Sequence, residues 1–214
     1  MTVTYDQFFP YVLPYAPAVP EMVATTVIQS ACMEFCQKSE WWIYDAPAFD
    51  SVAGQWAYNP APPANTQVVR FRSCWYDNLP LIPKSTVELN LLYPYNWREQ
   101  ATQPLYFTNT LLPGELDIVP PPQLSEPGVL VCTLSIMPTI TSTGVDDSLL
   151  NYWSEVIGRG ARARLLERPD EPYSNPQQAM VCWTNFRRGI AEARIQREKS
   201  LTRTETRVRP PKVF

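Results

Sequence analysis

The sequence predicts an α+β protein: a helical bundle, an inserted small antiparallel β-sandwich or barrel lobe, and an extended C-terminal tail. Apolar residues recur with helical spacing in residues 20–45 and 142–200, whereas 46–141 reads as short strands punctuated by proline. Within residues 201–214, β-branched side chains alternate with charged ones, and the sequence offers no neighbouring strand for this segment to pair with. The 214-residue chain can form one domain with an added lobe, and 23 prolines against 7 glycines predict stiff connections.

The N-terminal region predicts a proline-rich arm followed by a helix. The arm covers residues 1–19 and is expected to be extended or turn-rich. The helix is expected from Glu21 to about Ser39, with Glu21 and Lys38 at the ends that the helix dipole prefers. Two neighbouring apolar rows define its buried face: Val23, Val27 and Ala31, and beside them Ile28, Cys32, Phe35 and Cys36.

Residues 46–141 are expected to form several short antiparallel strands. In "TQVVRFRSCWY", Val69 and Phe71 fall on one face of a strand. The arginines between and after them, Arg70 and Arg72, fall on the other. Prolines at the strand ends limit pairing at the sheet edges.

Two hairpins and one buried strand follow in this region. Asp77-Asn78 predicts the first hairpin turn, and Pro113-Gly114 predicts the second. The segment "GVLVCTLSIMP" alternates, which predicts one inward-facing row: Leu130, Cys132, Leu134 and Ile136.

Two further helices are predicted after residue 145. Asp146-Asp147 is an N-cap signal for the first, which Pro169 stops, and Asn175-Pro176 begins the second, which runs to about Lys199. Because the loop between them is short, we expect an antiparallel pair. The first helix carries the stripe Leu150, Trp153, Ile157 and Ala161. The second buries Ala179, Cys182, Trp183, Phe186, Ile190 and Ala193.

The C-terminal tail has the period of a β-strand. Thr202, Thr204, Thr206 and Val208 alternate with Arg203, Glu205, Arg207 and Arg209, and the chain ends in Pro210, Pro211, Lys212, Val213 and Phe214. A lone strand is unstable in water, so the tail is either disordered or added to a partner's sheet. The clean alternation favours strand addition.

The composition excludes several kinds of chemistry. The chain has no histidine, which removes Ser-His-Asp and Cys-His catalysis and His-containing zinc sites. Cys32 and Cys36 could supply two thiolates, but a tetrahedral site needs four ligands, so core packing is favoured. We therefore expect no catalytic residues, no metal site and no cofactor, although enzymes that use carboxylates, lysine or tyrosine remain open.

Other candidate motifs have structural interpretations. Of the adjacent Trp41 and Trp42, one is expected in the core at the seam with the β lobe and the other at an interface. The carboxylate pair Asp45 and Asp50 lacks a fixed partner for glycosidase chemistry, and Asp147 is better explained as a helix cap. "GRGARAR" follows no strand and lacks the ending of a phosphate loop.

The charge is unevenly distributed. Residues 1–158 carry 5 basic and 15 acidic side chains, a net −10, and residues 159–214 carry 13 and 6, a net +7. The basic part predicts either a surface for nucleic acid or an acidic partner, or a solvated helix face. Arg159, Arg162 and Arg164 are expected on the exposed side of their helix, suited to DNA contact. Their reversal to glutamate is then expected to impair DNA retention and not folding.

The sequence carries no sign of export or of a membrane span. Residues 1–20 lack a basic region and an unbroken apolar core, so no secretion signal is expected. No apolar run approaches the ~20 residues of a membrane helix. Five cysteines, an odd number, fit reduced thiols. We expect a soluble protein made in the cytoplasm, without a membrane partner.

Both ends of the chain resemble head-to-tail adaptor proteins of tailed double-stranded DNA bacteriophages. The N-terminal match lies within residues 10–45, and the C-terminal match within 145–210 through "ARARLLERPDEPYSNPQQA" and "FRRGIAEAR". The family often has Gly-Cys-Pro where this chain has "PAVPE". The N-terminal positions that match the family's motif are Ala31, Glu34, Phe35, Cys36, Ser39 and Trp42.

The resemblance implies a virion structural protein rather than an enzyme. Such a protein forms a ring of twelve copies under the portal, in the neck between capsid and tail, and continues the channel for packaged double-stranded DNA. The helices would face the portal, the β lobe would contact tail or nozzle proteins, and the tail from Thr202 would dock into the portal. The alternative from another class is a cellular module that binds carbohydrate or peptide on the tryptophans of its β lobe; an enzyme comes third.

Overall fold

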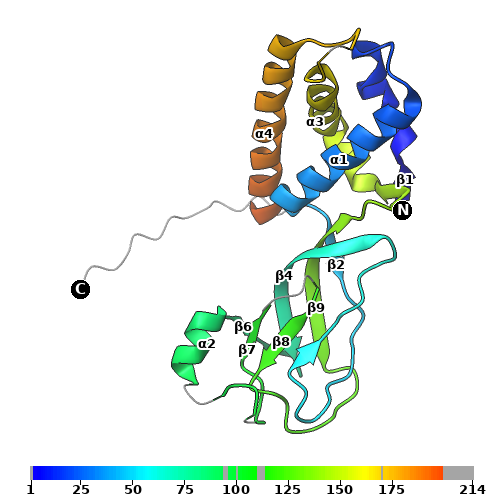
Figure 1. Ribbon diagram of the computed structural model, residues 1–214. Helices are drawn as coiled ribbons and strands as arrows, with labels where there is room; N and C mark the ends of the chain where they lie inside the picture. Colours follow the sequence, from blue (N-terminus) through cyan, green and yellow to red (C-terminus); the bar gives the residue numbers. More distant parts are fainter. Residues whose placement is uncertain (1, 94–95, 100, 110–113, 170, 200–214) are drawn as a thin grey trace, which may run out of the picture.

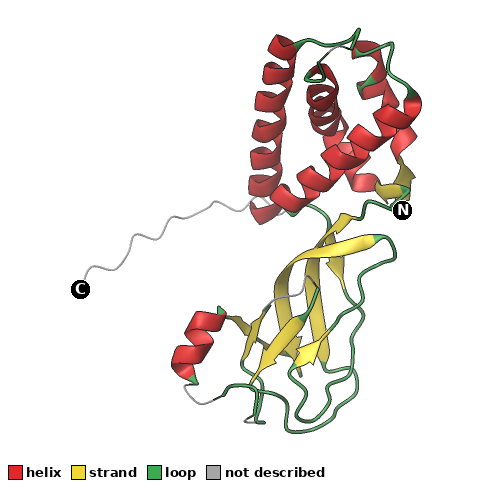
Figure 2. Ribbon diagram, viewed as in Figure 1, coloured by secondary structure: helices red, strands yellow, loops and turns green. Residues whose placement is uncertain are grey.

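The computed structural model describes residues 2–93, 96–99, 101–109, 114–169 and 171–199, and it confirms the α+β class (Figures 1 and 2). Its helices are α1 (Glu21–Ser39), α2 (Thr86–Leu92), α3 (Asp147–Leu166) and α4 (Pro176–Lys199), with the 3-10 helices η1 (Tyr5–Tyr11) and η2 (Leu13–Tyr15). Its strands are β1 (Thr2–Thr4), β2 (Ile43–Asp45), β3 (Ala57–Tyr58), β4 (Thr66–Tyr76), β5 (Leu79–Pro80), β6 (Ile82–Pro83), β7 (Tyr106–Thr108), β8 (Leu116–Val119), β9 (Leu130–Pro138) and β10 (Gly144–Asp146).

The helices α1, α3 and α4 pack together with η1 at one end of the molecule, here called the helical part (Figure 1). Helix α1 has the predicted bounds, and its two apolar rows are buried except for the half-buried Val23. The helix ends where Glu40 adopts a left-handed conformation, with φ of 53°. The periodicity alone was sufficient for this helix because its buried face is continuous.

Residues 2–16 are turn-rich as predicted, but they do not form a free arm. Strand β1 pairs antiparallel with β10, and η1 packs against α1 and α3. Phe8, Val12 and Ala16 are buried in the same core as α1. The apolar side chains of this segment explain the difference, because an exposed arm would leave them in water.

Helices α3 and α4 lie side by side and run antiparallel (Figure 1). A Cβ atom at Gly160 would lie 2.7 Å from the ring of Phe186, and one at Gly189 would lie 2.5 Å from Val156. From the first contact to the second, the residue number falls from 160 to 156 in α3 and rises from 186 to 189 in α4. The two contacts therefore show that the helices run antiparallel. The small residues Gly160 and Gly189 therefore permit the close packing of α3 against α4.

Two details of α3 differ from the prediction. The N-cap is Asp146 rather than Asp147, since its carboxylate accepts from the backbone N–H of Ser148 at 3.0 Å. The buried stripe begins at Leu149, while Leu150 is only partly buried. The prediction at the next helix is confirmed, because Asn175 Oδ1 accepts from the N–H of Gln178 at 3.1 Å.

We expect Gly160→Val to destabilise the protein by about 1–3 kcal/mol, because the added carbons overlap the Phe186 ring. The measurement is the free energy of unfolding in urea, with unfolding monitored by circular dichroism. The matched control is Asn151→Val on the exposed face of the same helix, where the cost is about 0.5 kcal/mol or less. Equal losses in the two variants would contradict the packing role of Gly160.

The remaining strands and α2, here called the β part, form two four-stranded sheets within the described residues. Their orders are β2-β9-β4-β5 and β3-β8-β7-β6. Side chains from both sheets share one core, which includes Phe71 and Leu134 from the first and Phe107 and Ile118 from the second. The sheets are antiparallel as predicted except for β6 and β7, which pair in parallel. The reason is α2, which lies between them in the chain and supplies the crossover that parallel strands need.

The alternation predicted for β4 is wrong at Val69. Bulges between Val68 and Arg70 and between Phe71 and Ser73 shift the register against β9. Val68 and Phe71 therefore face the core, and Val69 does not share their face. A bulge is set by the pairing of two strands, so one strand's pattern does not reveal it.

The other predictions for the β part are confirmed where the structure describes them. Asp77 and Asn78 both have positive φ and join β4 to β5. Strands β7 and β8 pair antiparallel, although residues 110–113 of their turn lie outside the described residues. Leu130, Cys132, Leu134 and Ile136 are all fully buried.

Helix α2 was not predicted, although its sequence carries a signal for it. Ser85 and Glu88 form a reciprocal capping box, with hydrogen bonds between each side chain and the other residue's backbone N–H. These interactions lower the pKa of Glu88 to about 2, chiefly through the backbone N–H of Ser85. The surrounding short, proline-rich segments obscured a helix of two turns.

The junction between the two parts is formed by the adjacent tryptophans. Trp42 packs against both the helical core and the β core, and its carbonyl accepts from the N–H of Ile136 at 2.9 Å. Trp41 packs edge-on against Trp153, with ring centres 5.1 Å apart. The predicted position at the seam is therefore confirmed, but both side chains are partly buried, so neither lies fully in the core. The interface role of one of them stays a prediction.

Candidate interaction surface

The predicted docking residues lie outside the part of the chain that the structure describes. They are Thr202, Arg203, Thr204, Thr206, Arg207, Val208, Arg209, Pro210, Pro211, Val213 and Phe214. Their role stays a prediction. The preceding helix, α4, ends at Lys199 beside the junction between the helical part and the β part (Figure 1).

Arg162 is buried, which contradicts its expected exposure. It is 5% exposed, and its Nη2 donates to Glu155 Oε1 at 2.7 Å. Its guanidinium lies 4.0 Å from the centre of the Tyr15 ring. Arg159 is partly exposed and pairs with the same carboxylate at 3.0 Å.

Arg164 is also engaged within the chain. Its guanidinium forms an ion pair with Glu34 of α1 and donates to the carbonyl of Gly160 at 2.7 Å. It also lies over the ring of Trp183, 4.8 Å from the ring centre. The physical reason for the wrong prediction is that long side chains bury their stems and find partners on neighbouring helices. Of the three arginines, only Arg159 keeps substantial exposure.

The electrostatics of Glu34 follow from its position between two cations. Partial burial by itself raises the pKa of this carboxyl group, but hydrogen bonds and charge from Lys38 and Arg164 outweigh it and lower the pKa. A lowered pKa means that this group stabilises the fold at neutral pH, and that its contribution is lost as the pH falls through the folded pKa.

We expect Arg164→Glu to destabilise the fold by about 3 kcal/mol, because it places a carboxylate against Glu34 in a partly buried site. This replaces the expectation that reversal would spare folding. The control is Arg188→Glu, since Arg188 is exposed and its ion-pair distance to Glu192 is 3.7 Å. Thermal unfolding measures both, and a melting temperature of Arg164→Glu equal to that of the control would contradict the structural role.

A network of charges joins the two parts of the molecule. Glu40, at the end of α1, accepts from Arg197 of α4 at 2.6 Å and from Arg70 of β4 at 2.9 Å. Arg197 also donates to the carbonyl of Ser39 at 2.9 Å. Burial and the charge of Arg197 lower the pKa of the neighbouring Arg72. The network therefore connects α1, α4 and β4 where α4 ends.

Sequence reasoning missed this network. Glu40 and Arg197 are 157 positions apart, and neither belongs to a recognisable motif. The one local signal is the position of Glu40 directly after a helix, where a left-handed residue is common but is usually glycine or asparagine. Glutamate is unusual at this position, and the structure shows that its side chain pairs with Arg70 and Arg197.

The β part exposes an apolar surface around α2. Val87 and Leu91 lie one helical turn apart on the outward face, and Leu92 is exposed beside them. Helix α2 lies at the outer edge of the β part, away from the helical part (Figure 1). Further exposed apolar side chains come from β5, β6 and the residue before β7: Leu79, Ile82 and Leu105. Exposed apolar side chains along one face of a helix, such as Val87 and Leu91, are typical of protein interfaces.

Two shallow grooves also lie on the β part. One, of about 430 Å³, lies between β4 and the edge of the second sheet and carries Arg70 and Lys84. The other, of about 450 Å³, lies at the hairpin turn of Asp77 and beside Trp75, which is 41% exposed. Trp75 is thus a tryptophan of the β part that a ligand could reach.

The cysteines and carboxylates weighed for chemistry have structural surroundings. Cys32 and Cys36 are fully buried in the helical core, and burial raises the pKa of both thiols. Asp45 accepts from the Thr133 hydroxyl at 2.7 Å, and Asp50 accepts from the N–H of Gly128 at 2.8 Å. Among the described residues, no group of three or more cysteine or acidic side chains is placed to hold a metal ion.

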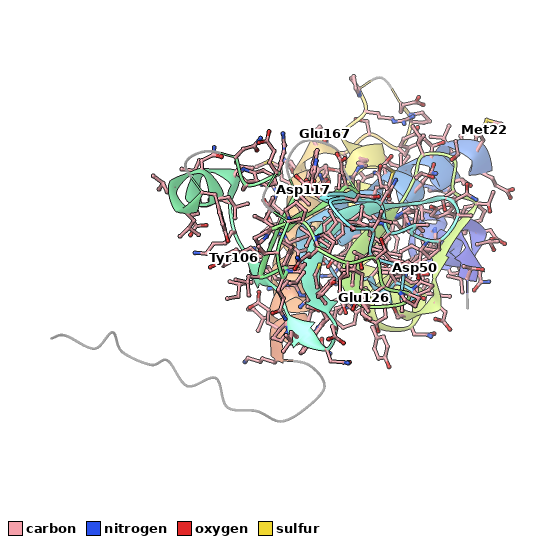
Figure 3. All side chains as sticks on the ribbon, turned by 90° about the horizontal axis from the view of Figure 1, so that it is seen from below. Met22, Asp50, Tyr106, Asp117, Glu126 and Glu167 are labelled. Atoms are coloured by element: carbon pink, nitrogen blue, oxygen red, sulfur yellow. The ribbon has the colours of Figure 1, made fainter. Side chains whose placement is uncertain are left out.

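The carboxylates at the far end of the β part hold loops together. Figure 3, which views the molecule from that end, labels Asp50 and Glu126. The backbone groups of Ser51 and Glu126 exchange two hydrogen bonds, and Glu126 accepts from the Tyr76 hydroxyl at 3.1 Å. In these contacts the carboxylates of Asp50 and Glu126 act as hydrogen-bond acceptors within the fold.

Comparison with known proteins gives no assignment. No family model matches the chain, and no curated protein matches it significantly. Within the described residues, none of the helices is long and apolar enough to cross a membrane.

Proposed function

We propose that the protein is a head-to-tail adaptor of a tailed double-stranded DNA bacteriophage, with a structural rather than a catalytic role. The observation that carries the proposal is the convergence of the two segments that resemble this family. They lie at opposite ends of the sequence, yet α1 packs directly against α3 and α4.

Residues of the N-terminal motif contact residues of the C-terminal segment, 145–210, within which the second resemblance lies. Glu34 pairs with Arg164 of "ARARLLE", and Phe35 packs against Trp153 with ring centres 5.5 Å apart. Ser39 donates to the carbonyl of Phe35 at 2.7 Å, and its own carbonyl accepts from Arg197. A chance match at two separate ends would not require these side chains to be partners. The contacts therefore support the resemblance.

The finer architecture belongs to the same proposal. The helical part is proposed as a bundle that faces the portal, with the β part as an inserted lobe that contacts tail or nozzle proteins. The apolar surface around Val87 and Leu91 supports the second contact. The protein would act in the virion neck as a ring of twelve copies, with the tail from Thr202 docked in the portal.

Non-specific contact with packaged DNA would come from cations that are exposed to solvent. Arg162 and Arg164 are unsuited because they are held within the chain. Arg187, Arg188 and Lys199 on the outward surface of α4 are exposed and can reach a phosphate backbone. Arg159 remains a candidate because it is partly exposed.

The test is to mix the full chain with purified portal rings and to examine the mixture by electron microscopy. The expected result is a second ring of density on one face of the portal, with the symmetry of the portal. A protein that stays monomeric and unbound at micromolar concentration would contradict the proposal.

The alternative is a module that binds carbohydrate or peptide, and the exposed Trp75 beside its groove favours it. A glycan array and a peptide array, probed with the wild type and Trp75→Ala, separate the two functions. Binding by a stable monomer that is lost in Trp75→Ala would support the module and not the adaptor.

A further inference from the structure

Two cysteines face each other inside the β part. Cys74 of β4 and Cys132 of β9 are directly paired in the register of the first sheet, and their sulfur atoms are 3.4 Å apart. Both are free thiols and both are buried. They are 58 positions apart, so their meeting depends entirely on the pairing of β4 with β9.

The backbone hydrogen bonds identify the kind of pair. The N–H of Asp77 donates to the carbonyl of Val129, which makes these two residues a hydrogen-bonded pair. Hydrogen-bonded and non-hydrogen-bonded pairs alternate along antiparallel strands. Cys74 and Cys132 lie three pairs further along, so they form a non-hydrogen-bonded pair. Their carbonyls confirm this: Cys74 accepts from Leu81 on the β5 side, and Cys132 accepts from Ala46 on the β2 side. Non-hydrogen-bonded positions bring Cα atoms to about 4.5 Å, at the short end of the range that disulfides span.

We propose that Cys74 and Cys132 form a disulfide when the protein is exposed to a low-molecular-weight disulfide oxidant. This bond would link β4 covalently to β9. In the reaction, one thiolate attacks the oxidant and forms a mixed disulfide, which releases one thiol. The second cysteine then attacks the mixed disulfide and releases the second thiol. The protein loses two thiol hydrogens, and the oxidant is reduced to two thiols. This property is independent of the proposed function.

The same surroundings determine when the bond forms. The hydrogen bond with Cys132 and burial raise the pKa of the Cys74 thiol, which leaves little of the reactive thiolate in the folded state. Oxidation therefore occurs while the chain folds or while the β part opens, and the completed bond is shielded from reductant. Sulfurs 3.4 Å apart need to approach by only about 1.4 Å to reach the bond length of a disulfide.

The experiment refolds the full chain with oxidised glutathione, and in parallel with a reducing agent. Free thiols are then counted in denaturant after the glutathione has been removed. The count is expected to fall from the five cysteines of the reduced chain to three. Peptide mapping should join the strand of Cys74 to that of Cys132. The melting temperature should rise by roughly 5–15 °C, since the bond closes a long loop.

Two variants serve as controls. After refolding with oxidised glutathione, Cys132→Ala should keep all its remaining thiols and show no rise in melting temperature. Cys182→Ala should still lose two thiols under the same conditions. Five free thiols in the oxidised wild type would overturn the proposal. So would glutathione retained on Cys74, or a bond that joins Cys32 to Cys36 instead. The thiol count and the map on the wild type decide the question even if a variant folds poorly.

Discussion

A chain that lacks residues 202–214 is expected to keep its fold and to lose its binding to portal rings. The fold should survive because, within the part of the chain that the structure describes, the buried residues of both cores lie between Tyr5 and Ala193. Binding should fall by at least about 100-fold, because strand addition supplies main-chain hydrogen bonds along the whole segment. Sedimentation with purified portal rings measures the binding, and circular dichroism measures the fold.

Point variants of the tail separate strand addition from charge. Thr204→Pro with Thr206→Pro removes two backbone donors and leaves every charge in place. Arg203→Gln with Arg207→Gln removes two charges and leaves the donors. If the tail adds a strand to the portal, the double proline variant loses most of its binding. The double glutamine variant keeps most of its binding, and its affinity depends less on salt concentration. Normal binding by the truncated chain would refute the docking role of the tail.

Glu40→Gln is expected to cause a large loss of stability, comparable to that of Arg164→Glu. Glu40 is the buried carboxylate between Arg70 and Arg197, and Arg197 is 7% exposed in its side chain. Removing the charge leaves an arginine buried without its main partner, which costs about 3 kcal/mol. For a chain of this size, the melting temperature should fall by roughly 6–12 °C.

Glu198→Gln is the matched control for this change. It also replaces a glutamate that pairs with Arg197, with 3.3 Å between Arg197 Nη2 and Glu198 Oε1. The Glu198 side chain, however, is 57% exposed. Exposed pairs contribute about 0–1 kcal/mol, so the control should unfold within about 3 °C of the wild type. Equal shifts in the two variants would show that the network at the junction does not hold the two parts together.

The sequence was sufficient wherever the cause of a structure is local. Helix α1 and the inward row of β9 follow from periodicity, because one face of each is buried continuously. The turn at Asp77-Asn78 follows from two residues that tolerate positive φ. Asn175 caps α4 through its own side chain. None of these features depends on a distant part of the chain.

Other features depended on partners far away in the sequence. Arg162 and Arg164 were predicted on the exposed side because a helical pattern does not show what packs beside it; Tyr15 and Glu34 supply their partners. The bulges of β4 depend on β9. The ion pairs of Glu40, at the junction, depend on the end of α4.

The sequence by itself determined the α+β class, the helices that resemble the adaptor family and the period of the tail, since each of these is written in neighbouring residues. Only the tertiary structure decided which charges remain free. It also decided that residues 2–16 belong to the helical core, and that Cys74 meets Cys132. The physical reason is that burial and pairing are properties of two surfaces in contact, and a sequence pattern describes one surface at a time.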